Sequence, residues 1–427
     1  MNRKLLNRRE IAPGVSLNFV ENDRYKTNYI TFYFVSKLDG KTASYNTLLS
    51  RVLTRGTENY PSQMKLNRAL DELYDACLSS DSVKVGEWHA LAISMALLDN
   101  AFALSGEDIT SKGIDLLEEV IFSPYLPGGV FSEEYVKSEK KMALLEIDSL
   151  VNNKARYARQ RMIEHMCRLE PYSTCALGEK REISKIGAES LFAYYKELIR
   201  TARIEIFFVG RFDEKAVEER VLKLFAQKER KFVPLPQPSI RTRAKGVKEV
   251  TEEMDITQAN LVMGFRTGVS IYDPQWRAMS LYNSVLGGSL TSKLFCVLRE
   301  KMCLCYSISS YPDALKGIMT VYAGIASENR ELAIKEALHQ MEEIRLGNIT
   351  PEELENARGA LTHALRGLGD NPGALADWFL PRILAGVFST PDEIIKELSL
   401  LTKEDVVGVS ENITLDTVYT LKGKEAK

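Results

Sequence analysis

The chain has little histidine, no long apolar run and almost no net charge. Only 4 histidines occur in 427 residues, so a metal site built on several imidazoles has few candidate ligands. The formal net charge of −2 argues against a nucleic-acid partner, because nucleic-acid binding usually requires a basic surplus. No apolar run approaches the roughly 18 residues that a membrane-spanning helix needs, so we expect no membrane partner. A hydrophobic content of 45% is ordinary for a globular protein.

The cysteine pattern argues against a disulfide-stabilised secreted protein and against a C-x-x-C redox or metal site. The 6 cysteines are scattered, none forms a C-x-x-C pair, and they are too few for a disulfide framework in a chain of this length. The basic start, MNRKLLNRRE, is followed by IAPGVSLNFV and not by an apolar stretch with a small-residue cleavage site. We therefore predict no secretory signal, reduced thiols and a cytoplasmic location.

The order of predicted elements repeats once along the chain. Residues 27–40 and 257–270 both show the alternation of a strand, and each is followed by a helical run, an amphipathic helix and further strands. Both halves continue into two long amphipathic helices, the last of which opens with the helix-start residues Thr350, Pro351 and Glu353. We predict an α+β fold of two homologous α/β domains that arose by internal duplication. Each would be an antiparallel sheet with helices packed on one face.

A proline-rich segment separates the two halves. Residues 228–246 read KERKFVPLPQPSIRTRAKG, in which closely spaced prolines with a basic flank indicate a stiff, exposed connector. We therefore predict an N-terminal domain at residues 1–230, a linker at 231–246 and a C-terminal domain at 247–427.

Two segments carry a family resemblance. They are YNTLLSRVLTRGTENYPS at residues 45–62 and LGGSLTSKLFCVLREKMCLCYSISSY at residues 286–311. With the order of helices and linker around them, they resemble the insulinase/pitrilysin family of zinc peptidases, in its short two-domain class of bacterial and mitochondrial processing peptidases. The resemblance covers nearly the whole chain. It implies two α+β domains and pairing with a second such subunit to enclose a chamber.

The positions that would hold the metal in such a peptidase carry unsuitable side chains. Active family members have H-x-x-E-H here, because histidines at i and i+4 share one helix face and the glutamate activates a zinc-bound water. In this chain the motif positions are Thr47, Ser50 and Arg51, and the resemblance places Glu146 at the third ligand. One carboxylate cannot hold zinc, so we predict no metal or cofactor in this chain. We hypothesise an ion pair between Arg51 and Glu146; the alternative is that Glu146 is an exposed helix carboxylate.

A second stretch comes close to a zinc motif. Residues 161–165 read RMIEH, with Arg161 in place of the first ligand ahead of Glu164 and His165. The G-T turn that follows the family motif is missing here. We expect an ordinary helix and no metal site.

The C-terminal half keeps another part of the family's machinery. The resemblance implies that an arginine and a tyrosine, spaced R-x-x-x-x-x-x-Y, reach the substrate, and Arg299 and Tyr306 have that spacing. A guanidinium offers a fork of donors for substrate carbonyls, and a phenol can donate to an oxyanion. The alternative is a surface arginine and a tyrosine packed on an apolar face.

Two functions of different classes follow. The first is the non-catalytic, substrate-binding subunit of a heterodimeric zinc peptidase, inactive alone, which supplies Arg299 and Tyr306 to a sister subunit with an intact H-x-x-E-H motif and its zinc. An extended peptide substrate would add to an edge strand through backbone hydrogen bonds. The second is a catalytically dead structural or adaptor homologue that acts by protein–protein interaction. The peptide, the sister and a homodimer of the isolated chain all stay open.

Overall fold

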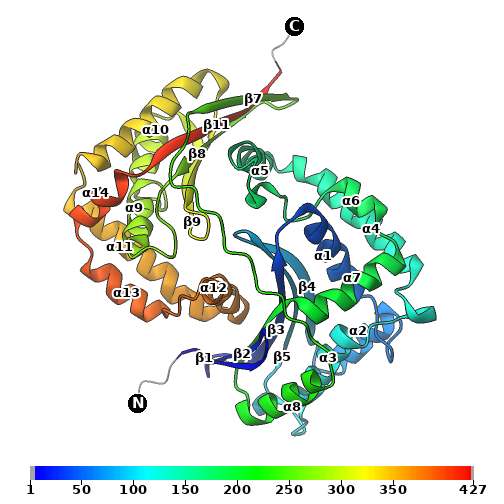
Figure 1. Ribbon diagram of the computed structural model, residues 1–427. Coiled ribbons are helices and arrows are strands. Elements are labelled where there is room, and N and C mark those ends of the chain that lie inside the picture. Colours follow the sequence, from blue (N-terminus) through cyan, green and yellow to red (C-terminus); the bar gives the residue numbers. More distant parts are fainter. Residues whose placement is uncertain (1–4, 425–427) are drawn as a thin grey trace. The chain divides into compact units, whose positions relative to one another are not determined.

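The chain forms two compact units, each built on one β-sheet (Figure 1). The computed structural model describes residues 5–424. The first unit, here called the N-terminal unit, contains Met1–Asp148, Thr174–Gln237 and Asn371–Leu380. The C-terminal unit contains Ser149–Ser173, Pro238–Asp370 and Pro381–Lys427. No helix among residues 5–424 is both long and apolar enough to span a bilayer.

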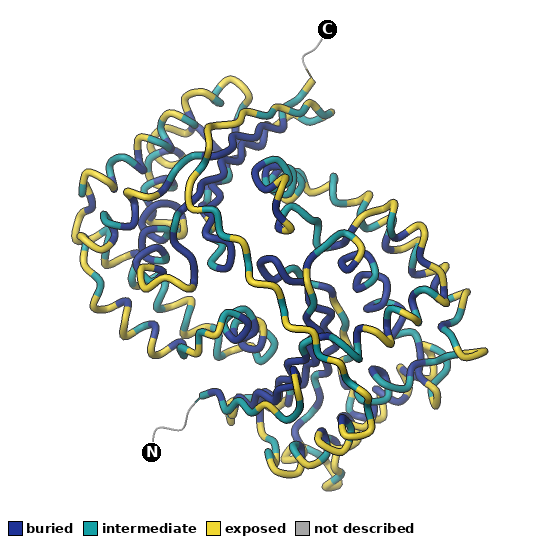
Figure 2. Tube along the Cα trace, in the orientation of Figure 1, coloured by how far each residue is buried: buried dark blue, intermediate teal, exposed yellow. Residues whose placement is uncertain are grey.

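The N-terminal unit holds a 6-stranded sheet in the order β1-β2-β6-β3-β5-β4. Strands β2 and β6 run parallel and the other neighbours run antiparallel. The central strands are buried along almost their whole length, because helices and loops cover both faces (Figure 2). The strands are β1 (Asn7–Ala12), β2 (Val15–Glu21), β3 (Thr27–Lys37), β4 (Cys77–Val85), β5 (Trp88–Leu98) and β6 (Arg203–Gly210).

The C-terminal unit holds a 5-stranded sheet in the order β7-β11-β8-β10-β9. Strands β7 and β11 are parallel and the rest are antiparallel, so the order and directions match those of the N-terminal sheet from β2 onward. This match agrees with the predicted duplication. The strands are β7 (Lys248–Met254), β8 (Ala259–Arg266), β9 (Cys305–Asp313), β10 (Ile318–Ile325) and β11 (Thr414–Gly423).

The predicted α+β fold with two peptidase-like domains is confirmed, with two refinements. Helices were expected on one face of each sheet, but the central strands are covered on both faces. Each sheet also contains one parallel pair, because a long helical crossover brings β6 back beside β2 and β11 back beside β7. The helices of the N-terminal unit are α1 (Gly40–Leu53), α2 (Gln63–Asp71), α3 (Ile109–Phe122), α4 (Glu133–Ser149), α6 (Lys180–Lys185), α7 (Ala188–Thr201) and α8 (Glu214–Ala226). Those of the C-terminal unit are α9 (Trp276–Leu286), α10 (Arg330–Arg345), α11 (Pro351–Gly367), α13 (Pro391–Leu400) and α14 (Lys403–Ser410).

The compact units differ from the predicted ranges 1–230, 231–246 and 247–427 because two segments are exchanged. Helix α5 (Lys154–Met166) packs on β8 and β11, where Gly264 leaves room for it: a Cβ there would lie 2.5 Å from Met162 Sδ. Most of α12 (Pro372–Leu384) belongs to the N-terminal unit, where the Tyr33 hydroxyl donates to Asp377 at 2.6 Å. Helix α5, from the N-terminal half of the sequence, therefore packs on the C-terminal sheet. Most of α12, from the C-terminal half, belongs to the unit that holds the N-terminal sheet. Residues 1–4 and 425–427 of the predicted ranges lie outside the described chain.

Candidate functional site

The altered metal motif lies in a cavity of the N-terminal unit. Helix α1 starts after Asp39, whose carboxylate accepts from the backbone N–H of Thr42 at 2.7 Å, and it carries all the motif positions on one continuous helix. A cavity of about 290 Å³ is lined by residues of this helix, of α4 and of the edge strand β4, among them Thr47, Ser50 and Arg51. The frame of a metal-binding helix is therefore intact.

The structure contains the hypothesised ion pair between Arg51 and Glu146. Arg51 Nη2 donates to Glu146 Oε2, and Arg51 Nη1 lies 3.8 Å from Glu139 Oε2. Arg55 Nη1 donates to the other oxygen of Glu139 at 3.1 Å. Two guanidinium groups and two carboxylates thus neutralise each other beside the cavity. Glu146 therefore pairs with Arg51, although its side chain stays 40% exposed at the helix surface.

The Thr47 hydroxyl and the Ser50 carbonyl connect α1 to β4. Thr47 Oγ1 lies 2.9 Å from Ser82 Oγ, and Ser50 Oγ donates to the Thr47 carbonyl at 3.0 Å. From the strand, Ser80 Oγ donates to the Ser50 carbonyl at 2.8 Å. This donor set does not suit zinc, which takes imidazole, thiolate or carboxylate ligands, and the Arg51 guanidinium stays protonated at every working pH. The absence of zinc from this chain stays a prediction.

His89 lies behind α1 with both ring nitrogens engaged. Asn46 Nδ2 donates to His89 Nδ1 at 2.9 Å, and His89 Nε2 donates to the Ala176 carbonyl at 2.8 Å, an assignment that follows from the partners. Burial lowers the pKa of His89 to about 4. The ring is therefore neutral and serves as a buried link between α1 and β5.

The near-motif at residues 161–165 belongs to an ion-pair network of the C-terminal unit. Arg161 donates to Glu252 of β7 at 2.8 Å through Nε and to Glu164 at 2.5 Å through Nη1. His165 Nε2 lies 3.8 Å from the same Glu252 oxygen. The side chains that resemble a metal motif therefore hold α5 to β7.

Arg299 and Tyr306 both lie on the C-terminal unit: Arg299 is in the π-helical turn Phe295–Lys301, and Tyr306 is at the start of the edge strand β9 that follows it. The Arg299 guanidinium lies 4.6 Å from the centre of the Phe295 ring, and its Nε lies 3.6 Å from Glu300 Oε1. Tyr306 is the second residue of β9 and is 62% exposed, and within residues 5–424 its hydroxyl has no hydrogen-bond partner. Among the described residues the two side chains form no hydrogen bond or cation–π contact with each other. The alternative of a tyrosine packed on an apolar face does not fit this exposure.

Cys305, next to Tyr306, is an unreactive thiol. Burial raises its pKa to about 11, and the charge of Arg299 opposes that shift only in part. The thiol is therefore protonated at neutral pH. Cys303, two residues earlier, is exposed and adopts a left-handed backbone conformation with φ of 52°.

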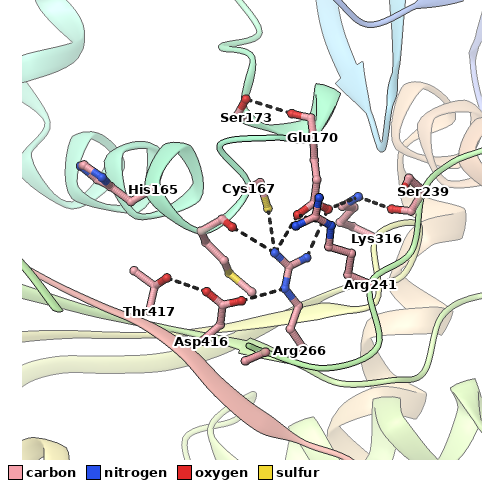
Figure 3. Close-up of polar contacts among 12 residues, drawn as sticks. His165, Cys167, Glu170, Ser173, Ser239, Arg241, Arg266, Lys316, Asp416 and Thr417 are labelled. Atoms are coloured by element: carbon pink, nitrogen blue, oxygen red, sulfur yellow. Dashed lines mark hydrogen bonds and ion pairs between the residues drawn. The ribbon is translucent and has the colours of Figure 1, made fainter. Parts of the chain in front are cut away.

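A buried charge cluster in the C-terminal unit was missed by the sequence analysis (Figure 3). Its centre is Glu170, which accepts from Arg266 Nη2 at 2.8 Å and lies 2.6 Å from Lys316 Nζ. Asp416 accepts from Arg266 Nε at 3.1 Å. We call these four residues the Glu170 cluster. It fastens the exchanged segment Ser149–Ser173 to the C-terminal sheet, and the distances in sequence between its members left no local signal.

Comparisons with known proteins agree with this description. Residues 185–361 match the protein family described as "Peptidase M16 inactive domain". The chain is 29% identical over 412 residues, 96% of each chain, to the "Probable inactive metalloprotease YmfF" of Bacillus subtilis strain 168. A conserved protein from Enterococcus faecalis V583 superimposes with a TM-score of 0.89 at 27% identity, covering 99% of this chain and 100% of that chain. A peptidase M16 inactive domain from Pseudomonas fluorescens shares the fold, with a TM-score of 0.79 at 17% identity over 99% of this chain and 98% of that chain.

The fold of this chain is thus that of the two-domain M16-like proteins to which it is similar. The chain is a homologue of the M16 peptidases, the insulinase/pitrilysin family that its motifs resemble. The similarity is to inactive members in particular, and the positions of the metal motif in this chain carry Thr47, Ser50 and Arg51.

Proposed function

We propose that this chain is the non-catalytic, substrate-binding subunit of a cytoplasmic heterodimeric zinc peptidase. A sister subunit with an intact H-x-x-E-H motif would hold the zinc, and this chain would supply Arg299 and Tyr306. The observation that carries the proposal is a contrast between two sites. The metal position is blocked by the pairing of Arg51 with Glu146, whereas the Tyr306 hydroxyl is exposed and has no partner in the described chain.

The chemistry of the two side chains supports this assignment. Arg299 touches a ring and one carboxylate oxygen at 3.6 Å, so most of its donors remain available for substrate carbonyl oxygens. Tyr306 can donate a hydrogen bond to the oxyanion that forms when water attacks a peptide carbonyl. Such a donor stabilises the transition state more than the ground state, because the charge develops only during the reaction.

Strand β9 offers a place for the peptide. It ends the sheet order of the C-terminal unit, so one of its edges has no neighbouring strand among the described residues. An extended peptide can add to such an edge through backbone hydrogen bonds and needs little sequence specificity to do so. A peptide on this edge would start beside Tyr306.

The experiment measures peptide hydrolysis by the two-subunit complex. We expect no turnover by this chain alone, and about a 100-fold loss in the complex for Arg299→Ala and for Tyr306→Phe, as for removal of an oxyanion donor. Tyr272→Phe is the matched control, because it removes the hydroxyl of another half-exposed tyrosine of the same unit. Unchanged turnover in both variants would contradict the proposal and would favour the adaptor role. A pull-down from native cells, read by mass spectrometry with a zinc assay, identifies the partner.

A further inference from the structure

Arg159 of α5 is a cation that two tyrosine rings hold in place. Its guanidinium carbon lies 4.8 Å from the ring centre of Tyr311 and 5.8 Å from that of Tyr322. Its Nε is buried without a hydrogen-bond partner, and no carboxylate of residues 5–424 forms an ion pair with it. By contrast, Arg161 on the same helix is paired with Glu164 and Glu252. Arg159 therefore carries an uncompensated charge in a fixed orientation.

The two rings lie on one face of the C-terminal sheet, at its edge. Tyr311 of β9 is opposite Thr320, and Tyr322 of β10 is opposite Ser309, so alternation puts both tyrosines on the same face. The Tyr322 hydroxyl donates to Asn260 Oδ1 at 3.0 Å, which fixes that ring. Tyr311 is 51% exposed and belongs to the strand with the open edge. The cluster is therefore rigid on one side and open to solvent on the other.

We propose that Arg159, Tyr311 and Tyr322 form a carboxylate-binding site for an extended peptide that lies along β9. The inference rests on the proposed function and adds a substrate class to it. A guanidinium stacked on aromatic rings keeps its outer N–H groups free to bind a carboxylate in the ring plane. Because a strand rises about 3.3 Å per residue, Tyr306 and Tyr311 are separated by roughly 17 Å. The acidic group would therefore lie about five residues from the bond that faces Tyr306.

Three fluorescent peptides test the site on the isolated chain. All have ten residues of Val, Thr and Ser around one central position: Glu with an amidated C-terminus, Gln with an amidated C-terminus, and Gln with a free C-terminus. We expect the Glu peptide to bind about 10-fold more tightly than the amidated Gln peptide in an anisotropy titration, because a charge-assisted hydrogen bond is gained. Arg159-dependent tight binding of the free-terminus peptide alone would assign the carboxylate to a chain end.

The variants separate recognition from folding. Arg159→Met and Tyr311→Ala should each remove the difference between the Glu and Gln peptides, and Arg159→Lys should keep part of it. Tyr311→Ala should leave the fold intact, because the Tyr311 ring is half exposed. Arg156→Met is the matched control: Arg156 is an exposed cation of the same helix and should not matter. Unfolding curves confirm that each variant is folded.

Equal binding of the three peptides would overturn the site, as would a Glu preference that survives in Arg159→Met and Tyr311→Ala. Failure of all three peptides to bind would overturn it as well. Turnover of the amidated Gln peptide by the two-subunit complex reports on Arg299 and Tyr306 without the acidic group. Loss of that turnover in Arg299→Ala, together with equal peptide binding, would remove the carboxylate site and leave the subunit role standing.

Discussion

Residue 51 shows how one side chain replaces a metal. An arginine at the second ligand position places a permanent positive charge where Zn²⁺ would sit, and Glu146, the third-ligand position, pairs with it. The carboxylate that would have bound the cation thus keeps a cationic partner. Helix α1 stays attached to β4 through the Thr47 hydroxyl and the Ser50 backbone carbonyl.

This substitution predicts that the metal site can be restored. In the triple variant Thr47→His, Ser50→Glu and Arg51→His, two imidazoles share one face of α1 and Glu146 is released as a third ligand. We expect about one zinc per chain and, at a zinc concentration 100 times the dissociation constant, a gain of about 2.7 kcal/mol in unfolding free energy. Mass spectrometry of the metal content and thermal unfolding with and without a chelator measure both effects.

The double variant Thr47→His and Ser50→Glu is the control for metal restoration. It retains Arg51, so the ion pair with Glu146 persists and zinc should not bind. Zinc uptake by this control, or by the unchanged chain, would show that Arg51 does not block the site.

At the scale of elements, the turn after α2 leads directly into β4, an edge strand of the N-terminal sheet. Tyr74 and Asp75 both adopt left-handed conformations, with φ of 60° and 56°, which is uncommon for residues with a side chain. Tyr74 is held in place because its hydroxyl donates to Glu107 at 3.0 Å. The Asp75 side chain forms no hydrogen bond within residues 5–424.

We therefore predict that Asp75→Gly stabilises the protein by about 0.5–1 kcal/mol, because glycine adopts this conformation without a steric penalty. Asp71→Gly is the matched control, since Asp71 is the last helical residue of α2. There glycine should destabilise by up to about 1 kcal/mol. Urea unfolding of both variants checks the signs. A loss of stability in Asp75→Gly would show that the turn is not strained at this residue.

Elements were the most predictable level of the structure. Alternation over 27–40 corresponds to β3 (Thr27–Lys37), and the signature at Thr350, Pro351 and Glu353 corresponds to a capping box at the start of α11. These signals are local, so one sequence suffices to read them. The ion pair between Arg51 and Glu146 was predictable only through the family resemblance, because the residues are 95 positions apart.

At the scale of the whole molecule, the sequence could not reveal in which of the two units α5 and α12 would pack. Helix α5 has the composition of a surface helix, yet it closes the C-terminal sheet through Met162 and Gly264. The members of the Glu170 cluster are also remote in sequence: Arg266 lies 96 positions from Glu170 and 150 from Asp416. Such pairings depend on the folded topology and leave no periodic pattern.

The Glu170 cluster carries the last prediction, which concerns the attachment of the exchanged segment. The side chains of Glu170, Arg266 and Lys316 are at most 2% exposed, so Glu170→Gln removes the carboxylate that the two buried cations share, although Arg266 keeps its ion pair with Asp416. We expect a loss of about 3–5 kcal/mol in unfolding free energy, as for other broken buried pairs. Glu253→Gln is the control, because Glu253 is half exposed beside Lys422 at 3.3 Å and should cost at most about 1 kcal/mol.

The contribution of Glu170 to the unfolding free energy should also depend on pH. Burial acts to raise the pKa of Glu170, but the hydrogen bonds and charges of Arg266 and Lys316 outweigh it and hold the pKa below its usual range. A carboxyl group whose pKa is lower in the folded state stabilises the fold above its unfolded pKa of about 4.3, and this contribution is lost as the pH falls further. The unchanged chain should therefore lose stability below about pH 4.3 more steeply than Glu170→Gln, in which residue 170 cannot titrate. Parallel acid-unfolding curves would show no role for Glu170 in acid stability. Increased protease cleavage within 149–173 in Glu170→Gln would show that this carboxylate holds the exchanged segment in place.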